Sequence, residues 1–211
     1  MKILLATRNK NKAREVARIL SEYRDTLGEI ELLTLDDVGI TEDVVENGST
    51  FEENAMIKAK AGAVAGYITL ADDSGIEVDA LGGAPGIYSA RFAGGHGDDE
   101  ANNVLLLEKL KDVPKEKRTA RYAVAIACVL PDGENFTVRG TTEGRILYEY
   151  DGKGGFGYDP LFWSIDLQKS FGRALPDEKN AVSHRGRAVR LAAEELAKRL
   201  NEKKETIHDY K

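Results

Sequence analysis

Residues 71–93 read ADDSGIEVDALGGAPGIYSARFA, and the rest of the chain is arranged around this stretch. The apolar run of residues 68–71 predicts a buried strand that ends at Asp72 and Asp73. Residues 76–81 alternate between apolar and polar, which predicts a half-buried strand, and the glycines and proline of residues 82–86 predict a turn. Two carboxylates at a strand end can hold a divalent cation or activate a water. An Asp-Asp-Ser-Gly β-turn explains the same residues, so this stretch alone leaves both interpretations open.

The composition is that of an ordinary globular protein. Hydrophobic residues make up 42% of the 211 residues and charged residues 31%. The formal net charge of -6 argues against a protein that coats nucleic acid. The single Cys128 excludes an internal disulfide framework, and neither a signal peptide nor a membrane span is predicted. We therefore expect a cytoplasmic protein with no nucleic-acid or membrane partner.

Charge is unevenly distributed along the chain. Basic residues dominate residues 2–18 and 179–190, whereas residues 36–57 carry acids and no base. Segments of opposite sign can neutralise each other on a surface. They can also surround a polyphosphate and its metal ion, so both explanations stay open.

The N-terminal segment has the pattern of an anion site. Residues 3–6 predict a buried strand, residues 7–12 a polar loop, and apolar residues at steps of three and four predict a helix from about residue 11. The free N–H groups and the dipole of a helix N-terminus attract anions, and Thr7, Asn9 and Lys12 add donors. The Walker motif is absent. Helix capping and solvated lysines explain this segment equally well.

The pattern of the chain changes after about residue 112. Before it, we expect a strand at 30–35, a helix opened by Thr50 with Glu53 in a capping box, and a helix at 100–110 capped by Asp98 or Asp99. After it, we expect strands at 118–130, 135–141, 143–150 and 161–163, with a turn at 131–133. The alternation of strands and helices thus gives way to an antiparallel meander.

Two later segments carry further candidate site residues. Residues 151–160 form a glycine-rich loop in which Phe156 could stack on a flat ring, although this segment taken alone favours a bulged turn with ordinary buried aromatics. Ser183 is a candidate N-cap for a helix with an apolar stripe to Leu200. That cap places His184 and Arg185 at the positive end of the helix dipole.

Four blocks of this sequence together resemble the inosine triphosphate pyrophosphatase family, the non-standard purine nucleoside triphosphate diphosphatases. They are residues 7–12, residues 48–59 (GSTFEENAMIKA), residues 71–93, and residues 154–160 taken with 179–185. Their order is preserved, and the resemblance spans residues 3 to about 200. Each block is weak or moderate evidence, but the combination is specific.

The resemblance implies an α/β fold with an elongated, mixed, twisted sheet, flanking helices, and two lobes around a substrate cleft. Residues 1–200 are expected to form this single domain, and residues 201–211 a charged, frayed C-terminal tail. The resemblance also implies a homodimer.

The implied reaction is Mg²⁺-dependent hydrolysis of inosine, deoxyinosine and xanthosine triphosphates (ITP, dITP and XTP) to the monophosphate and pyrophosphate. This activity removes deaminated purines from the nucleotide pool and keeps them out of DNA and RNA. A phosphatase that releases orthophosphate is one alternative, although the D-x-D motif is absent at residues 72–74. A non-catalytic nucleotide-binding regulator is the other.

The resemblance also implies a role for individual residues. Asp73 is the expected water-activating acid and metal ligand, and Asp72 is its less certain neighbour. Val45 stands where many family members have an acid, so either Glu46 replaces that ligand or Asp73 holds Mg²⁺ with waters and phosphate oxygens. The expected substrate-binding residues are Thr7, Arg8, Asn9, Lys10, Asn11, Lys12, Lys58, Ser74, Phe156, Gly157, Tyr158, Asp159, Lys179, His184 and Arg185.

Base selectivity is expected to depend on Arg185, whose guanidinium only donates hydrogen bonds. A 6-keto purine offers it an acceptor, whereas adenine offers an amino donor, and an unpaired buried guanidinium penalises adenine strongly. Guanine shares the 6-keto group, so its 2-amino group must be penalised separately.

Overall fold

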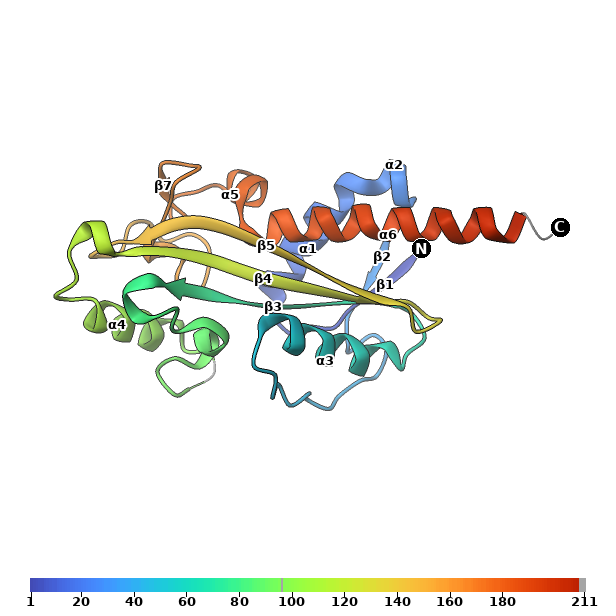
Figure 1. Cartoon of the computed structure of the whole chain (residues 1–211), viewed down its shortest axis with the longest axis horizontal. Coiled ribbons are helices and arrows are strands. Elements are labelled where there is room, and N and C mark those ends of the chain that lie inside the picture. The colour runs from blue at the N-terminus through green and yellow to red at the C-terminus, as the bar shows by residue number, and fades with distance from the viewer. Residues whose placement is uncertain (96, 209–211) are drawn as a thin grey trace.

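A long, twisted sheet runs through the molecule (Figure 1). The computed structural model describes residues 1–95 and 97–208, and within them the sheet has seven strands in the order β2-β1-β3-β4-β5-β6-β7. The strands are β1 (Lys2–Leu5), β2 (Glu31–Leu33), β3 (Ile68–Val78), β4 (Thr119–Val129), β5 (Asn135–Ile146), β6 (Phe162–Ser164) and β7 (Lys169–Ser170). β1 lies parallel to β2 and β3, and the other neighbouring pairs are antiparallel. The expected mixed sheet is therefore confirmed.

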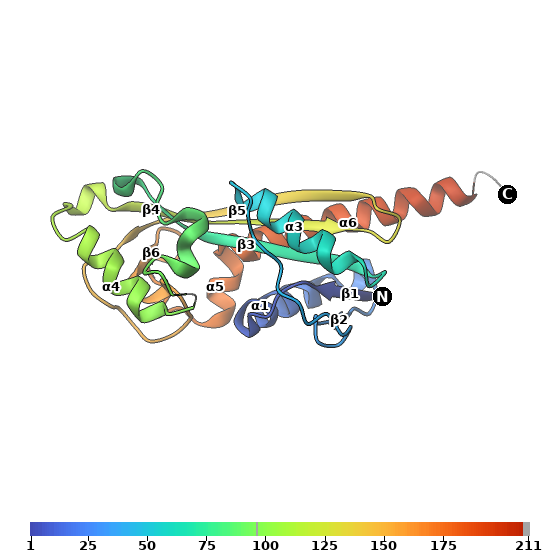
Figure 2. The same ribbon diagram turned by 90° about the horizontal axis from the view of Figure 1, so that it is seen from below.

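Helices cover both faces of the sheet. They are α1 (Lys10–Leu20), α2 (Arg24–Leu27), α3 (Phe51–Ala63), α4 (Asp99–Lys109), α5 (Pro176–Val182) and α6 (His184–His208). In Figure 1, α1, α2 and α6 lie on one side of the long strands and α3 and α4 on the other; Figure 2 shows the same ribbon from below. None of the helices in the described part of the chain is long and apolar enough to span a membrane.

The central strand β4 explains this layering through the size of its side chains. Val124, Ile126 and Cys128 belong to the core packed under α1 and α6, whereas the alternate residues Ala123, Ala125 and Ala127 face α3. Successive side chains of a strand point to opposite faces. Small residues on one face therefore let α3 approach closely, while larger ones fill the space under α6.

The strand β3 is longer than the sequence predicts. It continues from Ile68 through both acids to Val78, so the prediction that it ends at Asp72 in a turn is wrong. The backbone of residues 69–78 pairs with β4 along its whole length. The acids do not interrupt the strand, because cationic side chains from three helices contact their carboxylates. After Val78 the chain forms a short 3₁₀ helix, Asp79–Leu81, instead of the expected strand to residue 81.

The strand β5 differs in a similar way. The sequence predicts two strands at 135–141 and 143–150, but the structure has one, Asn135–Ile146. Residues 135–145 pair with β4 without interruption, and Thr142 at the expected break is fully buried. Continuous pairing with a long partner strand thus decides the length of both β3 and β5.

The C-terminal helix α6 is longer than the sequence predicts. Ser183 caps α6 as expected, because its Oγ accepts a hydrogen bond from the amide of Gly186. The preceding helix α5 was not predicted. The expectation of a frayed tail from residue 201 is wrong as far as His208, where α6 ends, and residues 209–211 lie outside the described residues. Ion pairs of Arg199 and Lys203 with the turn between β4 and β5 stabilise this extension.

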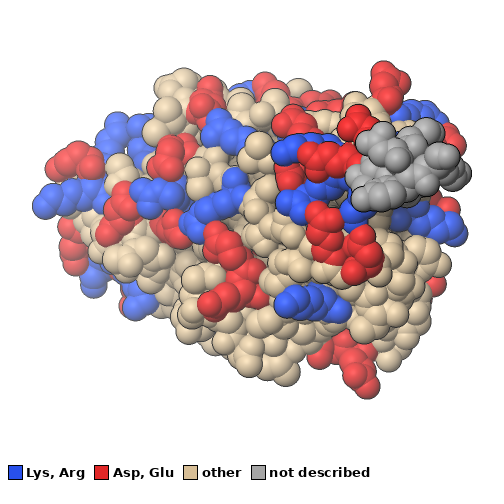
Figure 3. Space-filling model, turned by 45° about the vertical axis from the view of Figure 1, so that its right-hand side comes forward, with Lys and Arg blue, Asp and Glu red and all other residues tan. Residues whose placement is uncertain are grey.

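Charged side chains of both signs are interspersed on the face of the molecule that Figure 3 shows. They gather around the C-terminal part of α6 as well as along the sheet. This mixture agrees with the ion pairs that connect α6 to the neighbouring turn, such as the 2.8 Å contact between Lys203 Nζ and Glu134 Oε2.

The short strand β1 leaves part of β3 without a neighbour on one side. β1 ends at Leu5, which lies opposite Leu70, so the edge of β3 is open from about residue 72 to residue 75; beyond it Ile76 donates to Ser89 Oγ and Glu77 pairs with Pro85. The chain leaves β1 for α1 and β2 on one side, whereas β3 lies on the other. Ligands of open α/β sheets bind at such switch points, outside the carboxyl ends of the strands. This open edge is the place to look for a site.

Candidate active site

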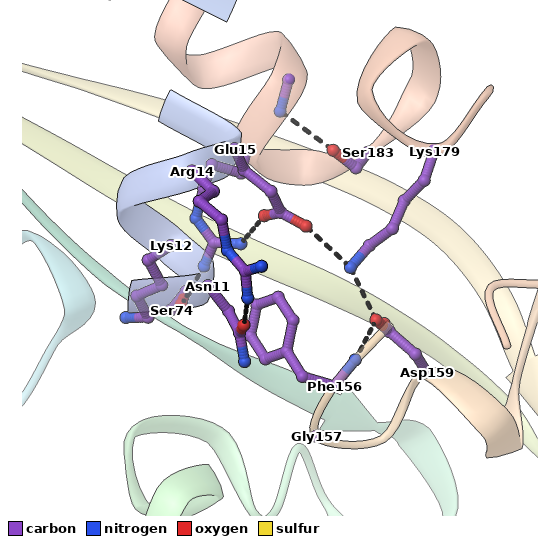
Figure 4. A network of polar contacts seen from close by, with 12 residues as sticks. Asn11, Lys12, Arg14, Glu15, Ser74, Phe156, Gly157, Asp159, Lys179 and Ser183 are labelled. Atoms are coloured by element: carbon purple, nitrogen blue, oxygen red, sulfur yellow. Dashed lines mark hydrogen bonds and ion pairs between the residues drawn. The ribbon is translucent and has the colours of Figure 1, made fainter. Parts of the chain in front are cut away.

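A cavity of about 820 Å³ lies against the open edge of β3. Its volume is within the usual range of small-molecule sites. Most of the predicted site residues line it, namely Thr7, Arg8, Asn9, Lys12, Glu46, Lys58, Asp73, Ser74, Phe156, Gly157, Tyr158, Asp159, Lys179, His184 and Arg185. Lys10 and Asn11 are not among the lining residues; Lys10 is exposed, and Asn11 Oδ1 accepts a hydrogen bond from Arg14 (Figure 4).

The loop after β1 presents the N-terminus of α1 to the cavity. Asn9 caps this helix, because its Oδ1 accepts hydrogen bonds from the amides of Asn11 at 2.9 Å and Lys12 at 3.1 Å. Thr7 Oγ1 accepts the amide of Asn9 at 3.2 Å. The side chain of Asn9 therefore acts as a helix cap, as the capping explanation of this segment predicts. The cap also orders the loop that precedes α1.

Arg8 connects the loop to the acidic segment of residues 36–46. Its guanidinium donates to Asp43 Oδ1 and Asp36 Oδ1, each at 3.0 Å, and to the carbonyl of Ile40 at 2.9 Å. Arg8 was expected to bind substrate, but its contacts in this structure hold the acidic segment beside the loop. This segment carries Glu46 to the cavity.

The adjacent acids Asp72 and Asp73 point to opposite faces of β3. Asp73 faces α3, where its Oδ1 lies 3.1 Å from Lys58 Nζ. Asp72 faces α1 and α6, and its Oδ2 lies 3.0 Å from Lys12 Nζ. The alternation of a strand requires this division. Two acids that are neighbours in sequence therefore have different surroundings and cannot act as one carboxylate pair.

The surroundings of Asp73 suit two roles for its carboxylate, as a ligand of a divalent cation and as a general base. Glu46 Oε1 lies 3.4 Å from Lys58 Nζ, so Lys58 contacts both Glu46 and Asp73, whereas the side chain of Val45 is exposed. Burial raises the pKa of the Asp73 carboxyl above its ordinary value and Glu46 adds to this effect, although Lys58 and Lys12 oppose it. The described residues contain no group of three or more metal-ligating side chains. Two carboxylates fit Mg²⁺, which usually keeps waters and substrate oxygens among its ligands.

The other end of the cavity contains a buried network of charged groups. Lys179 Nζ donates to Asp159 Oδ2 at 2.6 Å and to Glu15 Oε1 at 2.9 Å (Figure 4). Glu15 Oε2 in turn accepts from Arg185 Nη1 at 2.5 Å. Burial alone would lower the pKa of the Lys179 ammonium, but the two acids outweigh burial and raise it. The network therefore holds a permanent cation at this end of the cavity.

The guanidinium of Arg185 is almost fully used by the protein itself. Its Nε donates to Asp72 at 3.3 Å, and its Nη2 donates to Asp72 at 3.2 Å and to Ser74 Oγ at 2.9 Å. With Nη1 already donating to Glu15, a single N–H of that nitrogen has no partner among the described residues. Arg185 can therefore present one donor, in a fixed direction, to a ligand.

Aromatic rings cover this network. The ring of Phe156 lies over Lys179 Nζ, with 4.5 Å from the nitrogen to the ring centroid. The imidazole of His184 stacks on Tyr122 with the ring centroids 4.7 Å apart. Burial lowers the pKa of His184 well below its ordinary value, so the imidazole is neutral. A flat ligand would meet an aromatic surface next to hydrogen-bond donors.

The helix α4 holds the glycine-rich loop in place. Asp99 Oδ2 accepts the amide of Gly157 at 2.7 Å, and Asn103 Nδ2 donates to the carbonyl of Gly157 at 2.9 Å. The hydroxyl of Tyr158 donates to the carbonyl of Ser89 at 2.7 Å. Gly157 and Tyr158 therefore fix the position of the Phe156 ring by their backbone and by packing.

Two polar side chains at the site were not predicted from the sequence. Glu15 was overlooked, although it follows Lys12 by one helical turn on α1 and so lies on the same face. Asn54 was also overlooked; its Nδ2 donates to Asp73 Oδ2 at 3.2 Å. The signal for Asn54 was its position four residues before Lys58 on the helix that faces Asp73.

These features define an α/β protein with a site for an elongated anionic ligand at the switch point of its sheet. Lysines and a helix N-terminus lie at one end of the site, acids suited to a metal lie beside them, and an aromatic surface with fixed donors lies at the other end. A concave lining of aromatic side chains with a few precisely placed charged groups is typical of small-molecule and cofactor sites.

The chain belongs to the Ham1 family, whose family model matches residues 3–195. It is 49% identical over 193 residues to the dITP/XTP pyrophosphatase of Exiguobacterium sibiricum, covering 90% of this chain and 94% of that protein. It is 47% identical over 204 residues to the dITP/XTP pyrophosphatase of Corynebacterium efficiens, covering 93% and 98% of the two chains. The resemblance seen in the sequence is thus confirmed.

Solved structures agree with this assignment. The Ham1 protein of Staphylococcus aureus superposes with a TM-score of 0.80 at 37% identity, covering 93% of this chain and 98% of that one. A nucleoside-triphosphatase / dITP/XTP pyrophosphatase from Mycobacterium abscessus superposes with a TM-score of 0.73 at 46% identity, covering 91% and 98%. The expected fold class is therefore confirmed by relatives as well as by the sheet itself.

Proposed function

We propose that this protein hydrolyses non-standard purine nucleoside triphosphates, namely ITP, dITP and XTP, to the monophosphate and pyrophosphate. The observation that carries the proposal is one cavity in which a cationic end, an acid with a raised pKa and an aromatic end with fixed donors lie in sequence. The curated relatives are named dITP/XTP pyrophosphatases, which supports dITP and XTP as substrates. The activity would remove deaminated purines from the nucleotide pool.

The triphosphate would bind at the N-terminus of α1. The amides of Asn11 and Lys12 donate to Asn9 Oδ1, so the dipole of α1 and the Lys12 and Lys58 ammonium groups would neutralise the phosphate oxygens. Both lysines are largely buried, with side-chain exposures of 17% and 14%. Their interaction with phosphate is therefore weakly screened by solvent.

Asp73 and Glu46 would hold the Mg²⁺ ion together with oxygens of the substrate. When bound, Mg²⁺ neutralises phosphate charge and makes a coordinated water more acidic. Asp73 would accept the proton of the attacking water while the water oxygen bonds to the α-phosphorus. The bond from that phosphorus to the oxygen bridging to the β-phosphate then breaks and releases pyrophosphate. The raised pKa of Asp73 favours this role, because a base is most effective when its pKa lies near the working pH. Lys58, held by both acids, contacts the same phosphates.

The base would lie against Phe156 with its polar edge toward Lys179, His184 and Arg185. The remaining N–H of Arg185 Nη1 needs an acceptor, which the 6-keto group of hypoxanthine or xanthine supplies and the amino group of adenine does not. A buried donor without a partner penalises the wrong base by orders of magnitude. Lys179 has a remaining N–H as well, so a second donor faces the same region.

The proposal is tested by mixing the purified protein and Mg²⁺ with ITP, XTP, ATP and GTP and assaying pyrophosphate and orthophosphate separately. Pyrophosphate from ITP and XTP, with little from ATP or GTP, is the expected result. Orthophosphate, or equal activity on ATP, would indicate a general nucleotide phosphohydrolase. Tight nucleotide binding without any product would indicate a regulator.

We further propose that the protein acts as a homodimer in the cytoplasm, where nucleotide pools are made. The support for this is the resemblance to a family of dimeric pool-cleansing enzymes. Light scattering of the purified protein measures the assembly directly, and a monomer mass would refute the dimer.

A further inference from the structure

Asp72 contacts both ends of the site. Its Oδ2 lies 3.0 Å from Lys12 Nζ at the phosphate end, and 3.3 Å and 3.2 Å from Nε and Nη2 of Arg185 at the base end. Its side chain is only 1% exposed. The other oxygen, Oδ1, is buried without a hydrogen-bond partner in the described part of the chain. A buried, half-satisfied carboxylate is costly, and such costs are typical of functional sites.

These contacts form part of a longer chain of alternating charges. From the phosphate end to the base end the charged groups are Lys12, Asp72, Arg185, Glu15, Lys179 and Asp159, and each contacts the next. Within this chain Asp72 is the group that joins the phosphate-binding lysine to the base-reading arginine. Glu15 and Asp159 lie wholly on the base side of it.

We propose that Asp72 is a positioning residue that couples phosphate binding to base selection, a role that rests on the function proposed above. By accepting from two nitrogens of Arg185, it fixes the plane of the guanidinium and the direction of the remaining N–H on Nη1. By accepting from Lys12 with the same oxygen, it places the ammonium where the triphosphate arrives. Asp72 acts through these two cations and contacts no reacting atom, so its loss changes selectivity as well as rate.

The test compares Asp72→Asn and Asp72→Glu with the wild type by measuring kcat and KM for ITP and ATP, and the affinity for both nucleotides by calorimetry without turnover, because the donor on Arg185 distinguishes a 6-keto group from a 6-amino group. We expect Asp72→Asn to reduce the preference for ITP over ATP by about tenfold to a hundredfold, the effect of losing one charge-assisted hydrogen bond. Asp72→Glu keeps the charge and should restore part of the preference. Asp79→Asn is the matched control, because Asp79 pairs with Arg121 at 3.1 Å outside the cavity and should leave the preference unchanged.

A second experiment leaves Asp72 unchanged, so its result can be interpreted even if the Asp72→Asn variant does not fold. Lys12→Met removes one partner of Asp72 at the phosphate end, and we expect the affinity for inosine monophosphate relative to adenosine monophosphate to change severalfold. Unchanged base preference in both Asp72→Asn and Lys12→Met would overturn the proposal, even if kcat fell. If the proposed function itself were wrong, the wild type would not hydrolyse ITP. The calorimetric comparison of nucleotide affinities would still test the role of Asp72 in that case.

Discussion

The substitution Asp73→Asn separates catalysis from stability at this site. Asn has nearly the same volume as Asp, and in the structure the two carboxylate oxygens lie 3.1 Å from Lys58 Nζ and 3.2 Å from Asn54 Nδ2. An amide in this place can accept from only one of these donors. The lost charge-assisted hydrogen bond costs about 1.5–3 kcal/mol. Lys58 keeps Glu46 as an anionic partner at 3.4 Å, and relief from burying a carboxylate offsets part of the cost, so we expect the free energy of unfolding to change by less than about 1.5 kcal/mol.

Turnover should respond very differently. Removing a general base costs roughly a hundredfold to ten-thousandfold in rate, and an amide cannot take the proton of the attacking water. We therefore expect kcat for ITP to fall by at least about a hundredfold while ITP still binds. Pyrophosphate release measures kcat, calorimetry measures affinity, and thermal melting measures stability. A kcat within about tenfold of wild type would refute the role of Asp73 as the base, and a parallel loss of ITP binding would show that it acts mainly in binding.

Three further substitutions and conditions test other parts of the reasoning. Gly75→Ala places a Cβ 2.2 Å from the carbonyl oxygen of Gly86, so it should destabilise the fold by about 1–3 kcal/mol in denaturant melts. Burial keeps the pKa of His184 well below 6.5, so the unfolded chain takes up a proton as pH falls below about 6.5 and the folded protein does not. Stability should then fall by up to about 1.4 kcal/mol per pH unit, and His184→Gln should remove that slope. Glu46→Gln should raise the Mg²⁺ concentration for half-maximal turnover by about tenfold, or about 1.4 kcal/mol, whereas Val45→Ala should leave it unchanged; equal effects would exclude Glu46 as a ligand.

The features predicted correctly from the sequence are mostly local ones. Thr50 caps α3 by accepting the amide of Glu53, and Asp98 caps α4, both as expected. A cap depends on residues within one turn, so its chemistry can be read from a short segment. The strands β1 and β4 were also predicted nearly to their ends, because their apolar runs are bounded by polar residues.

The features that were missed depend on distant parts of the chain. The continuation of β3 through Asp72 and Asp73 requires Lys12, Lys58 and Arg185, which come from three different helices. In a short window of sequence the two acids look like a strand end, since isolated buried charges are rarely tolerated. The periodicity of the sequence predicts which face of the strand a side chain points to. The cation that neutralises a buried acid can be identified only when the positions of the helices are known.

Because the two acids of β3 point to opposite faces, the site depends on the correct register of this strand in the sheet. One peptide bond separates the acid that faces Lys58 from the acid that faces Arg185, and only the pairing of β3 with β4 assigns each to its side. A shift of one residue in that pairing would exchange every side chain of the strand between the faces. Asp72 would then meet α3 and Asp73 would meet α6, with both cationic networks broken. A misregistered molecule would therefore lack both networks at once, so correct pairing of β3 with β4 is a condition for assembling any part of the site.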